Sequence, residues 1–582
     1  QKGTVSIEKT GEVFSGVNIS GEENTDVIYQ PVYEVKGLAG AVYEITAAED
    51  VITPDGTLRY AKGEVVDTVT TYENGLAKSK ELYLGRYTVV EITAPEGMVI
   101  NKEAHEVELT YAGQEVAVTE TATSFVNERQ KVTVSLEKAI EKNDIFNIGN
   151  GDEVKNISFG LFAAEELVSA SGTSIPADGL IEIISLSENG KAVIKTDLPF
   201  GSYYVKELAT DEHYILTAKY PFTFSYAGQD TANVEIAVND GKPIENKLIY
   251  GSVSGKKITE NGEALGGAVI GLFKADETEF TKENALMTAT SQKDGSFSFE
   301  KVPYGNWLVR EIEQPEGFVL DETSYEVKIS EVAQVIEVEI VNEYVHGNIK
   351  LTKVDEDYPD NKLTGATFEV YKDVNGDGKL DDGDELIGTL NETSTGIYEM
   401  KELLYGKYLV RETKAPEGFE LDKGVYSVFI EKDETTYEVE NKAGVGFINT
   451  AMKGNLKIVK TSSDGKVEGF TFRVTGVNGY DRSFTTDKNG EIVIEGLRIG
   501  DYTVSEVQDS VSASYVLPAD KIATVKVGST TVVEMHNELR DTPKTGDNSN
   551  VGLWTALAGL SALGIVGTAV VAYRKKKKED NE

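Results

Sequence analysis

Short runs in which apolar and polar residues alternate follow one another along most of this chain. Runs of about four to eight residues with period two, separated by Gly, Asn and Asp turns, are typical of β-strands. Val5-Ser-Ile7-Glu-Lys9 is one of them. The pattern changes near the C-terminus, where Val551 to Tyr573 is a continuous apolar run without a charge. We therefore predict an all-β chain that ends in one transmembrane helix.

Three short patterns recur five times. The first is a Gly followed at two, four and six positions by an aromatic residue, a Val and a Glu, as in Gly85-Arg-Tyr87-Thr-Val89-Val-Glu91. The second is an alternating run that ends on Lys, and the third is a short run that ends on Asn. The glutamates are Glu91, Glu207, Glu311, Glu412 and Glu506, the lysines are Lys9, Lys138, Lys257, Lys353 and Lys460, and the asparagines are Asn127, Asn246, Asn342, Asn449 and Asn537.

The recurrences divide the chain into repeats. At each internal junction the next repeat begins five residues after the closing Asn, a spacing that selects Asn449 over Asn441. Repeats of about 100 residues built from short strands fit β-sandwiches. We predict five tandem domains, followed by a C-terminal signal, with boundaries at 1–130, 131–250, 251–346, 347–453, 454–540 and 541–582. Linkers this short leave little slack, so we expect a rod with limited bending.

The recurring Lys, Glu and Asn are polar residues in phase with the apolar, inward-facing positions of their strands. Buried Lys and Glu are rare unless they are paired or functional. One explanation is a buried salt bridge with an Asn bonded to it, which gives little net stability. The other is chemical. Burial lowers the pKa of a lysine and raises that of a glutamate. A neutral amine is a nucleophile, and a protonated Glu can donate to the Asn side-chain carbonyl and shuttle a proton. Attack by the amine and loss of ammonia would join the first strand to the last by an isopeptide bond.

These repeats resemble the collagen-adhesin B-type domains, also called SpaA-like pilin domains. The Glu strand of that family is often followed by Ala-Pro-x-Gly-aromatic, which here reads Ala415-Pro-Glu-Gly-Phe419, with similar segments at 94–98 and 314–318 but not in the second and fifth repeats. The early strand of the family appears as Leu363 to Tyr371 and Leu38 to Ile45. The resemblance implies immunoglobulin/prealbumin-like sandwiches with an intramolecular Lys–Asn isopeptide bond assisted by Glu. It thereby assigns the five glutamates as promoting residues and pairs each lysine with the asparagine of its own repeat.

The C-terminal segment carries a motif, a span and a basic tail in that order. The motif is Thr542-Pro543-Lys544-Thr545-Gly546, the span is 551–573 and the tail is 574–578. The span is about 35 Å of helix, enough to cross a hydrocarbon core of about 30 Å. An ordinary single-pass anchor is one interpretation.

The same order of features resembles the cell-wall sorting signal of Gram-positive surface proteins. In that family a sortase cuts a Leu-Pro-x-Thr-Gly motif after Thr and joins the Thr to peptidoglycan or to a pilin lysine. Thr542 replaces the Leu, which leaves the sortase class open. The resemblance implies a precursor held by the membrane span and a mature protein linked covalently to the cell wall, with residues 1–540 outside the cell.

The composition of the chain excludes some classes of binding partner. The net charge of -41 argues against nucleic acid and anionic membranes. Without Cys, no disulfide can reinforce the chain. In the fourth repeat the oxygen-bearing side chains have the spacing of a calcium loop, and the alternative is a solvated hairpin tip. The candidate ligand positions are Asp373, Asn375, Asp377, Lys379, Asp381 and Asp384. We predict no other cofactor.

We predict a wall-anchored surface stalk or adhesin, or an accessory pilin, that is a sortase substrate and no enzyme. No Tyr-Pro-Lys motif of polymerising pilins occurs in the sequence. Two alternatives remain. One is a binding module for a host or matrix ligand in the first two repeats, whose insertions include 144–156. The other is the C-terminal stalk of a larger surface protein or enzyme, because Gln1 is not an initiator Met and a head could precede it.

Overall fold

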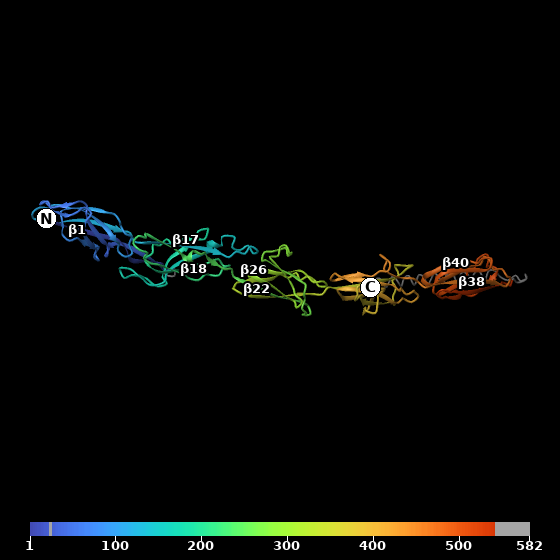
Figure 1. Cartoon of the computed structure of the whole chain (residues 1–582). Helices are drawn as coiled ribbons and strands as arrows, with labels where there is room; N and C mark the ends of the chain where they lie inside the picture. The colour runs from blue at the N-terminus through green and yellow to red at the C-terminus, as the bar shows by residue number, and fades with distance from the viewer. Residues whose placement is uncertain (23–25, 542–582) are drawn as a thin grey trace. The chain divides into compact units, whose positions relative to one another are not determined.

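The structure is a computed structural model that describes residues 1–22 and 26–541. Within these ranges the regular structure consists of strands and three short 3-10 turns, which confirms the all-β prediction (Figure 1). None of the described segments is a helix long and apolar enough to cross a membrane. The predicted sorting motif, span and basic tail lie outside the described residues. The described chain forms two compact units, and the boundary between them in the sequence falls between Tyr344 and Val345.

The third repeat shows the common plan, which is two sheets packed face to face. Its strands are β22 (Tyr250–Thr259), β23 (Val269–Lys274), β24 (Met287–Thr290), β25 (Ser296–Pro303), β26 (Gly305–Glu313), β27 (Tyr325–Ile329) and β28 (Val335–Asn342). One sheet has the order β25-β22-β28 and the other β24-β23-β26-β27. The first and last strands, β22 and β28, are parallel neighbours. Alternating residues such as Val253, Val309 and Ile340 fill the space between the sheets and are fully buried.

The first two repeats keep this plan and share one sheet. The strands of the first repeat are β1 (Lys2–Ser20), β2 (Ile28–Gly37), β3 (Val42–Ala47), β4 (Val51–Ile52), β5 (Leu58–Tyr60), β6 (Val65–Thr70), β7 (Leu76–Lys78), β8 (Leu82–Tyr83), β9 (Gly85–Thr93), β10 (His105–Leu109) and β11 (Val118–Asn127). Those of the second are β12 (Lys131–Ile140), β13 (Ser158–Ala163), β14 (Leu167–Val168), β15 (Ser174–Ile175), β16 (Leu180–Ser185), β17 (Lys191–Val193), β18 (Gly201–Ala209), β19 (Tyr220–Phe224), β20 (Asn233–Ala237) and β21 (Ile244–Asn246), with 3-10 turns η1 (Glu153–Asn156) and η2 (Val238–Gly241).

The fourth and fifth repeats repeat the two-sheet arrangement. The fourth consists of β29 (His346–Asp355), β30 (Thr367–Lys372), β31 (Glu385–Thr389), β32 (Asn391–Ser394), β33 (Ile397–Leu404), β34 (Gly406–Lys414), β35 (Val425–Ile430), β36 (Thr435–Glu438) and β37 (Phe447–Asn449). The fifth consists of β38 (Lys453–Ser462), β39 (Thr471–Gly476), η3 (Val477–Gly479), β40 (Tyr480–Thr485), β41 (Glu491–Arg498), β42 (Gly500–Glu506), β43 (Tyr515–Val516), β44 (Lys521–Val525) and β45 (Thr530–Leu539).

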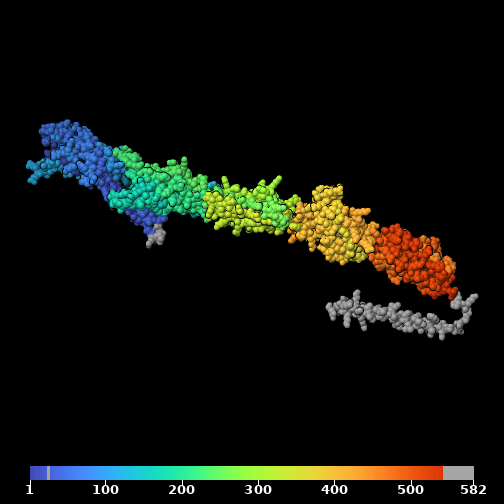
Figure 2. Space-filling model, turned by 90° about the horizontal axis from the view of Figure 1, so that it is seen from below, coloured from blue at the N-terminus to red at the C-terminus, as the bar shows by residue number. Residues whose placement is uncertain are grey.

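The extra residues of the first repeat form the joint with the second. Strand β1 continues past Lys9 and forms an antiparallel hairpin with β2, and β2 pairs with β16 at Ile28 and Leu180. Phe14, Val17 and Tyr29 of this hairpin pack against the core of the second repeat. The hairpin, in blue, lies along the surface of the second repeat in Figure 2. A sheet edge of the second repeat is thereby covered by the first.

The insertion of the second repeat forms the joint with the third. Phe146 and Ile148 of segment 144–156 belong to the same buried cluster as the core of the third repeat. The Phe146 ring lies 4.8 Å from that of Trp307 in an edge-to-face arrangement. The segment therefore packs against its neighbour instead of projecting as a free loop.

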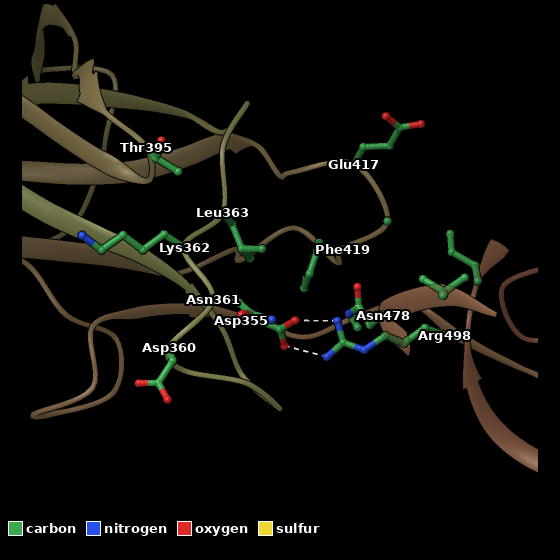
Figure 3. Close-up of a pocket in the computed structure, with 14 residues that line it drawn as sticks. Asp355, Asp360, Asn361, Lys362, Leu363, Thr395, Glu417, Phe419, Asn478 and Arg498 are labelled. Carbon is green, nitrogen blue, oxygen red and sulfur yellow. Dashed lines mark hydrogen bonds and ion pairs between the residues drawn. The ribbon is translucent and has the colours of Figure 1, made fainter. Parts of the chain in front are cut away.

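A single arginine reaches across the joint between the fourth and fifth repeats. Arg498 at the end of β41 binds both carboxylate oxygens of Asp355, at 2.5 and 2.6 Å, and binds Asp357 at 2.9 Å. Asp355 is 1% exposed. The pair lies on one side of a pocket that Phe419 and Asn478 also line (Figure 3). Charges hold this joint and apolar packing holds the joint between the second and third repeats, whereas the first joint combines the apolar hairpin with an ion pair between Arg129 and Asp197.

Candidate functional site

The recurring Lys and Asn lie on parallel neighbouring strands in the same register in every repeat. Lys353 on β29 is opposite Phe447 on β37, two residues before Asn449. In the other repeats, too, the lysine is opposite the residue two positions before its Asn. These pairs are Lys9 and Phe125, Lys138 and Ile244, Lys257 and Ile340, and Lys460 and Met535. Because residues two apart share a face of a strand, the long lysine side chain and the Asn point to the same side. The structure thus brings each Lys to the Asn with which it is paired by sequence.

The glutamate of each repeat comes from the facing sheet. It is opposite a buried residue of the early strand: Tyr43, Phe159, Ile270, Phe368 and Phe472 in the five repeats in turn. The aromatic residue four positions before the glutamate is held by a hydrogen bond of its own. The Tyr408 hydroxyl donates to the Leu404 carbonyl at 2.7 Å, and the Trp307 indole N–H donates to the Pro303 carbonyl at 2.9 Å. All fifteen residues of these Lys–Glu–Asn triads are buried, and Glu506 is the most exposed at 8%.

In the first three repeats the lysine Nζ contacts the Asn Oδ1 directly. The pairs are Lys9–Asn127, Lys138–Asn246 and Lys257–Asn342. The same Nζ atoms lie 3.2, 3.6 and 3.6 Å from an oxygen of Glu91, Glu207 and Glu311 respectively. Each amine is therefore held between the amide it would attack and a carboxyl that can exchange a proton with it.

The last two repeats bring the same residues together less closely. Lys353 Nζ donates to the Phe447 carbonyl at 3.0 Å and lies 3.8 Å from Glu412. Lys460 Nζ donates to the Thr461 carbonyl at 2.5 Å. The Oδ1 atoms of Asn449 and Asn537 are buried without a hydrogen-bond partner.

The Asn amide nitrogen, and not its oxygen, faces the glutamate in all five triads. Asn Nδ2 donates at 3.0 Å to Glu91, 2.8 Å to Glu207, 3.0 Å to Glu311, 2.9 Å to Glu412 and 2.6 Å to Glu506. This orientation suits an ionised pair, because an ammonium group can only donate and a carboxylate can only accept. The predicted hydrogen bond from a protonated Glu to the Asn carbonyl requires the amide to turn about its Cβ–Cγ bond.

Burial sets the direction of the pKa shifts in the triads. Desolvation lowers the pKa of Lys9, Lys257 and Lys460, and it lowers the pKa of Lys138 and of Lys353 to about 8. Burial also raises the pKa of Glu311, Glu412 and Glu506. These shifts favour transfer of a proton from lysine to glutamate, which the sequence argument expected from burial alone.

Two backbone contacts of the triads escaped the sequence analysis. In the first four repeats the glutamate accepts a hydrogen bond from the backbone N–H ten residues later, at 2.8 Å each time. The residues that donate it are Asn101, Thr217, Asp321 and Asp422, which do not all have the same side chain. A backbone donor leaves no signature in a sequence.

The second contact is a hydrogen bond between the backbone of each triad lysine and the carbonyl of a turn glycine. The backbone N–H of Lys9 donates to Gly75 at 2.7 Å, and equivalent bonds join the other four lysines to Gly190, Gly295, Gly396 and Gly490. Gly75 has a φ of +80°, and a Cβ there would lie 2.3 Å from the Lys9 carbonyl oxygen. An Asn, Asp or Thr before each of these glycines was the available sequence signal.

The candidate calcium loop is closed by its own hydrogen bonds. Asp373 accepts the amides of Gly376 and Gly378, and Asp384 accepts those of Val374 and Asp381. Within the described residues no group of three or more His, Cys, Asp or Glu side chains is arranged to hold a metal ion. Calcium at this loop stays a prediction, and the observed contacts also fit the solvated hairpin tip.

Comparison with known proteins gives two family matches. The profile of the SpaA prealbumin-like fold domain matches residues 32–123, 251–344, 347–443 and 454–539. The profile of the LPXTG cell wall anchor motif matches residues 543–581. The second match identifies a surface protein attached to the cell wall, which confirms the predicted location.

Two curated proteins are similar to parts of the chain. Colossin-A of Dictyostelium discoideum is 23% identical over 506 residues, which are 77% of this chain and 4% of that protein. The trypsin-resistant surface T6 protein of Streptococcus pyogenes is 26% identical over 143 residues, which are 23% of this chain and 25% of that protein. The chain thus spans a quarter or less of the length of either relative.

Solved structures with similar parts include Gram-positive surface proteins and pilins. The Bacillus anthracis TIE protein is 20% identical with a TM-score of 0.41, covering 66% of this chain and 69% of that chain. BcpA, the major pilin subunit of Bacillus cereus, is 15% identical with a TM-score of 0.27, covering 59% and 100%. The streptococcal ancillary pilin is 19% identical with a TM-score of 0.21, covering 50% and 100%.

Proposed function

This chain belongs to the SpaA family of prealbumin-like fold domains, and from that premise we propose that it is a wall-anchored stalk or accessory pilin whose repeats crosslink themselves. The observation that supports this is the triad. A buried Lys and a buried Asn face each other on the first and last strands, with a Glu from the opposite sheet, in the same register five times.

The proposed reaction forms one amide bond and releases one ammonia per repeat. The lysine passes a proton to the glutamate and becomes a neutral amine, which burial favours. Its Nζ attacks the Asn side-chain carbon, a bond forms between them, and the bond from that carbon to Nδ2 breaks. The glutamate takes the second proton from the attacking nitrogen and gives a proton to the departing Nδ2, which leaves as ammonia. No oxidant, metal or cofactor is consumed.

The position of the glutamate carboxyl suits this series of proton transfers. In the second repeat Oε1 of Glu207 lies 3.6 Å from Lys138 Nζ and accepts from Asn246 Nδ2 at 2.8 Å. One carboxyl therefore touches both the attacking nitrogen and the leaving nitrogen. Such a shuttle is general acid–base catalysis by a single group, and it acts once, so we propose no turnover and no enzyme activity.

The anchor motif implies processing by a sortase and linkage to the cell wall. We propose that Thr545 is the residue joined to peptidoglycan or, in a pilus, to a pilin lysine. A host or matrix ligand remains the alternative function, but the insertion that motivated it, 144–156, packs against the third repeat. A head preceding Gln1, on a larger surface protein or enzyme, remains the other proposal.

Intact mass spectrometry of the full chain tests the crosslinking. We expect the loss of one ammonia per bond, up to five, and branched Lys–Asn peptides after digestion. Glu412→Ala should remove one loss, because Lys353 and Asn449 then have no group to exchange protons. Glu417→Ala, at an exposed glutamate of the following turn, is the matched control and should keep all losses. A wild-type mass equal to the plain sequence mass would contradict the proposal.

A further inference from the structure

The two oxygens of the triad glutamate have different partners in the first four repeats. Oε2 accepts the backbone N–H of the residue ten positions later, from Asn101, Thr217, Asp321 and Asp422. Oε1 is the oxygen that lies nearest the lysine, at 3.2, 3.6, 3.6 and 3.8 Å. One oxygen is thus held by the backbone and the other lies toward the lysine. The Asn Nδ2 donates to Oε1 in the second and third repeats, to both oxygens in the first and to Oε2 in the fourth.

This division determines where a proton can reside on the carboxyl. A backbone N–H donates and cannot accept, so the oxygen that it contacts must offer a lone pair. When the glutamate is neutral, its proton is therefore placed on Oε1, toward the lysine and the asparagine. In the fourth repeat Oε1 of Glu412 is buried without a hydrogen-bond partner and is free to carry that proton.

We propose that the backbone amide ten residues after the glutamate is a positioning group that directs the glutamate proton toward the lysine and asparagine, and that the fifth repeat, which lacks it, crosslinks slowest. This proposal rests on the crosslinking function proposed above. It adds a contribution from the backbone of the loop that follows the glutamate strand.

The fifth repeat lacks the backbone partner of its carboxyl. Oε1 of Glu506 accepts from Asn537 Nδ2 at 2.6 Å, while Oε2 is buried without a hydrogen-bond partner. No backbone N–H therefore restricts the proton of a neutral Glu506 to the oxygen nearest the lysine. Lys460 Nζ donates to the Thr461 carbonyl, much as Lys353 Nζ donates to that of Phe447 in the fourth repeat. The missing amide is thus what separates the carboxyl of the fifth repeat from the other four.

The cause lies in the loop after β42. Ten residues beyond Glu506 is Val516, which belongs to β43 and pairs with Glu538 on β45. The loop itself closes on a turn in which Asp509 and Ser512 bind each other's backbone N–H groups, at 2.8 and 3.0 Å. The chain therefore has no N–H to offer Glu506 at the equivalent position.

A time course on the unaltered protein is the first test. The full chain is synthesised in a cell-free system, samples are quenched at intervals, and the branched peptide of each repeat is quantified by mass spectrometry. We expect the fifth crosslink to form about tenfold more slowly than the other four, or not at all, the effect of one hydrogen bond to a charged group. Equal rates in all five repeats would overturn the proposal. Absence of every crosslink would instead refute the proposed function.

Removal of one backbone N–H in the third repeat is the second test. Asp321→Pro removes the N–H, whereas Asp321→Asn keeps it and keeps an acceptor for the Thr323 amide and the Tyr325 hydroxyl. We expect the proline variant to slow crosslinking of the third repeat about tenfold while the other repeats keep their rates, and the asparagine variant to match wild type. Wild-type rates in a folded proline variant would overturn the proposal.

Folding of the variant is checked separately from its chemistry. The Lys257 amide, bonded to the Gly295 carbonyl at 2.7 Å, reports by hydrogen exchange whether β22 is intact. A slow crosslink with normal protection of this amide identifies a positioning effect that a merely structural role would not produce. If the proline variant unfolds, the wild-type time course decides the proposal alone.

Discussion

The joint between the second and third repeats differs in kind from the joint between the fourth and fifth. The first repeat extends a hairpin onto the second, and the second inserts Phe146 into the core of the third. The fifth repeat instead reaches back with Arg498 to a buried Asp355. Apolar packing is short-ranged and insensitive to salt, whereas a charged clamp depends on protonation and ionic strength. The same sandwich plan is therefore connected by two kinds of joint with different responses to the surroundings.

Phe146→Ala should produce the largest change at the joint between the second and third repeats. The ring is 7% exposed and stacks edge-on against Trp307, and truncating a buried Phe costs about 3–5 kcal/mol. The amides of Ile249 and Tyr304, which hydrogen-bond at this joint, should then exchange much faster. Ile145→Ala, at a neighbour that is 60% exposed, is the control. Unchanged protection in Phe146→Ala would mean that the insertion does not hold the joint.

Arg498→Ala should have a smaller effect at the joint between the fourth and fifth repeats. It leaves the Asp355 carboxylate without its bidentate partner, and hydrogen bonds to charged groups contribute about 1.5–3 kcal/mol. The loss of stability at the joint stays in this range because water reaches the aspartate once the joint opens. The amides of Met452 and Ile499 report on this joint, and Arg482→Ala, at an exposed arginine of the same repeat, is the matched control. Equal exchange in both variants would show that the clamp contributes nothing.

Acid should weaken the charged joint between the fourth and fifth repeats and spare the apolar joint between the second and third. Burial tends to raise the pKa of Asp357, but hydrogen bonds from Lys453 and Arg498 outweigh it and hold the pKa below its usual value of 3.8. A lowered carboxylate pKa contributes stability that is fully present above 3.8 and is lost as the pH falls through the folded pKa. Because Asp357 is partly exposed, we expect less than about 1 kcal/mol.

Hydrogen exchange at Met452 and Ile249 between pH 5 and pH 2.5 measures this difference, after correction for the intrinsic rates. A parallel response of the two joints would contradict the distinction between them. Asp357→Asn should abolish the acid response of Met452 while leaving Ile249 unchanged.

The sequence predicted the parts of the molecule that depend on local pattern. Period-two alternation located the strands, and the phase of Lys353, Glu412 and Asn449 placed them inward, as the structure has them. The closing spacing also selected Asn449, which contacts Glu412, over Asn441. These features follow from residues a few positions apart on one strand.

Features that depend on a distant partner could not be predicted in the same way. Phe14 and Tyr29 continue the alternating pattern of their own repeat, yet their apolar surface is covered by the second repeat. Nothing near Arg498 in sequence indicates Asp355, which precedes it by 143 residues. The amide that holds the glutamate in the first four repeats is a backbone group, which Asn, Thr and Asp residues alike supply.

The register of the first and last strands determines when the proposed crosslink could form. Lys9 and Asn127 are 118 residues apart, and they meet only after the last strand of the repeat has docked beside the first. A repeat that is still being threaded across the membrane therefore holds its lysine but not its acceptor, and it stays an open chain that can be translocated. The proposed bond would therefore form after each repeat has emerged, in the order of synthesis. Each bond would then mark a domain that has completed both its export and its fold, and a repeat interrupted before its last strand would carry none.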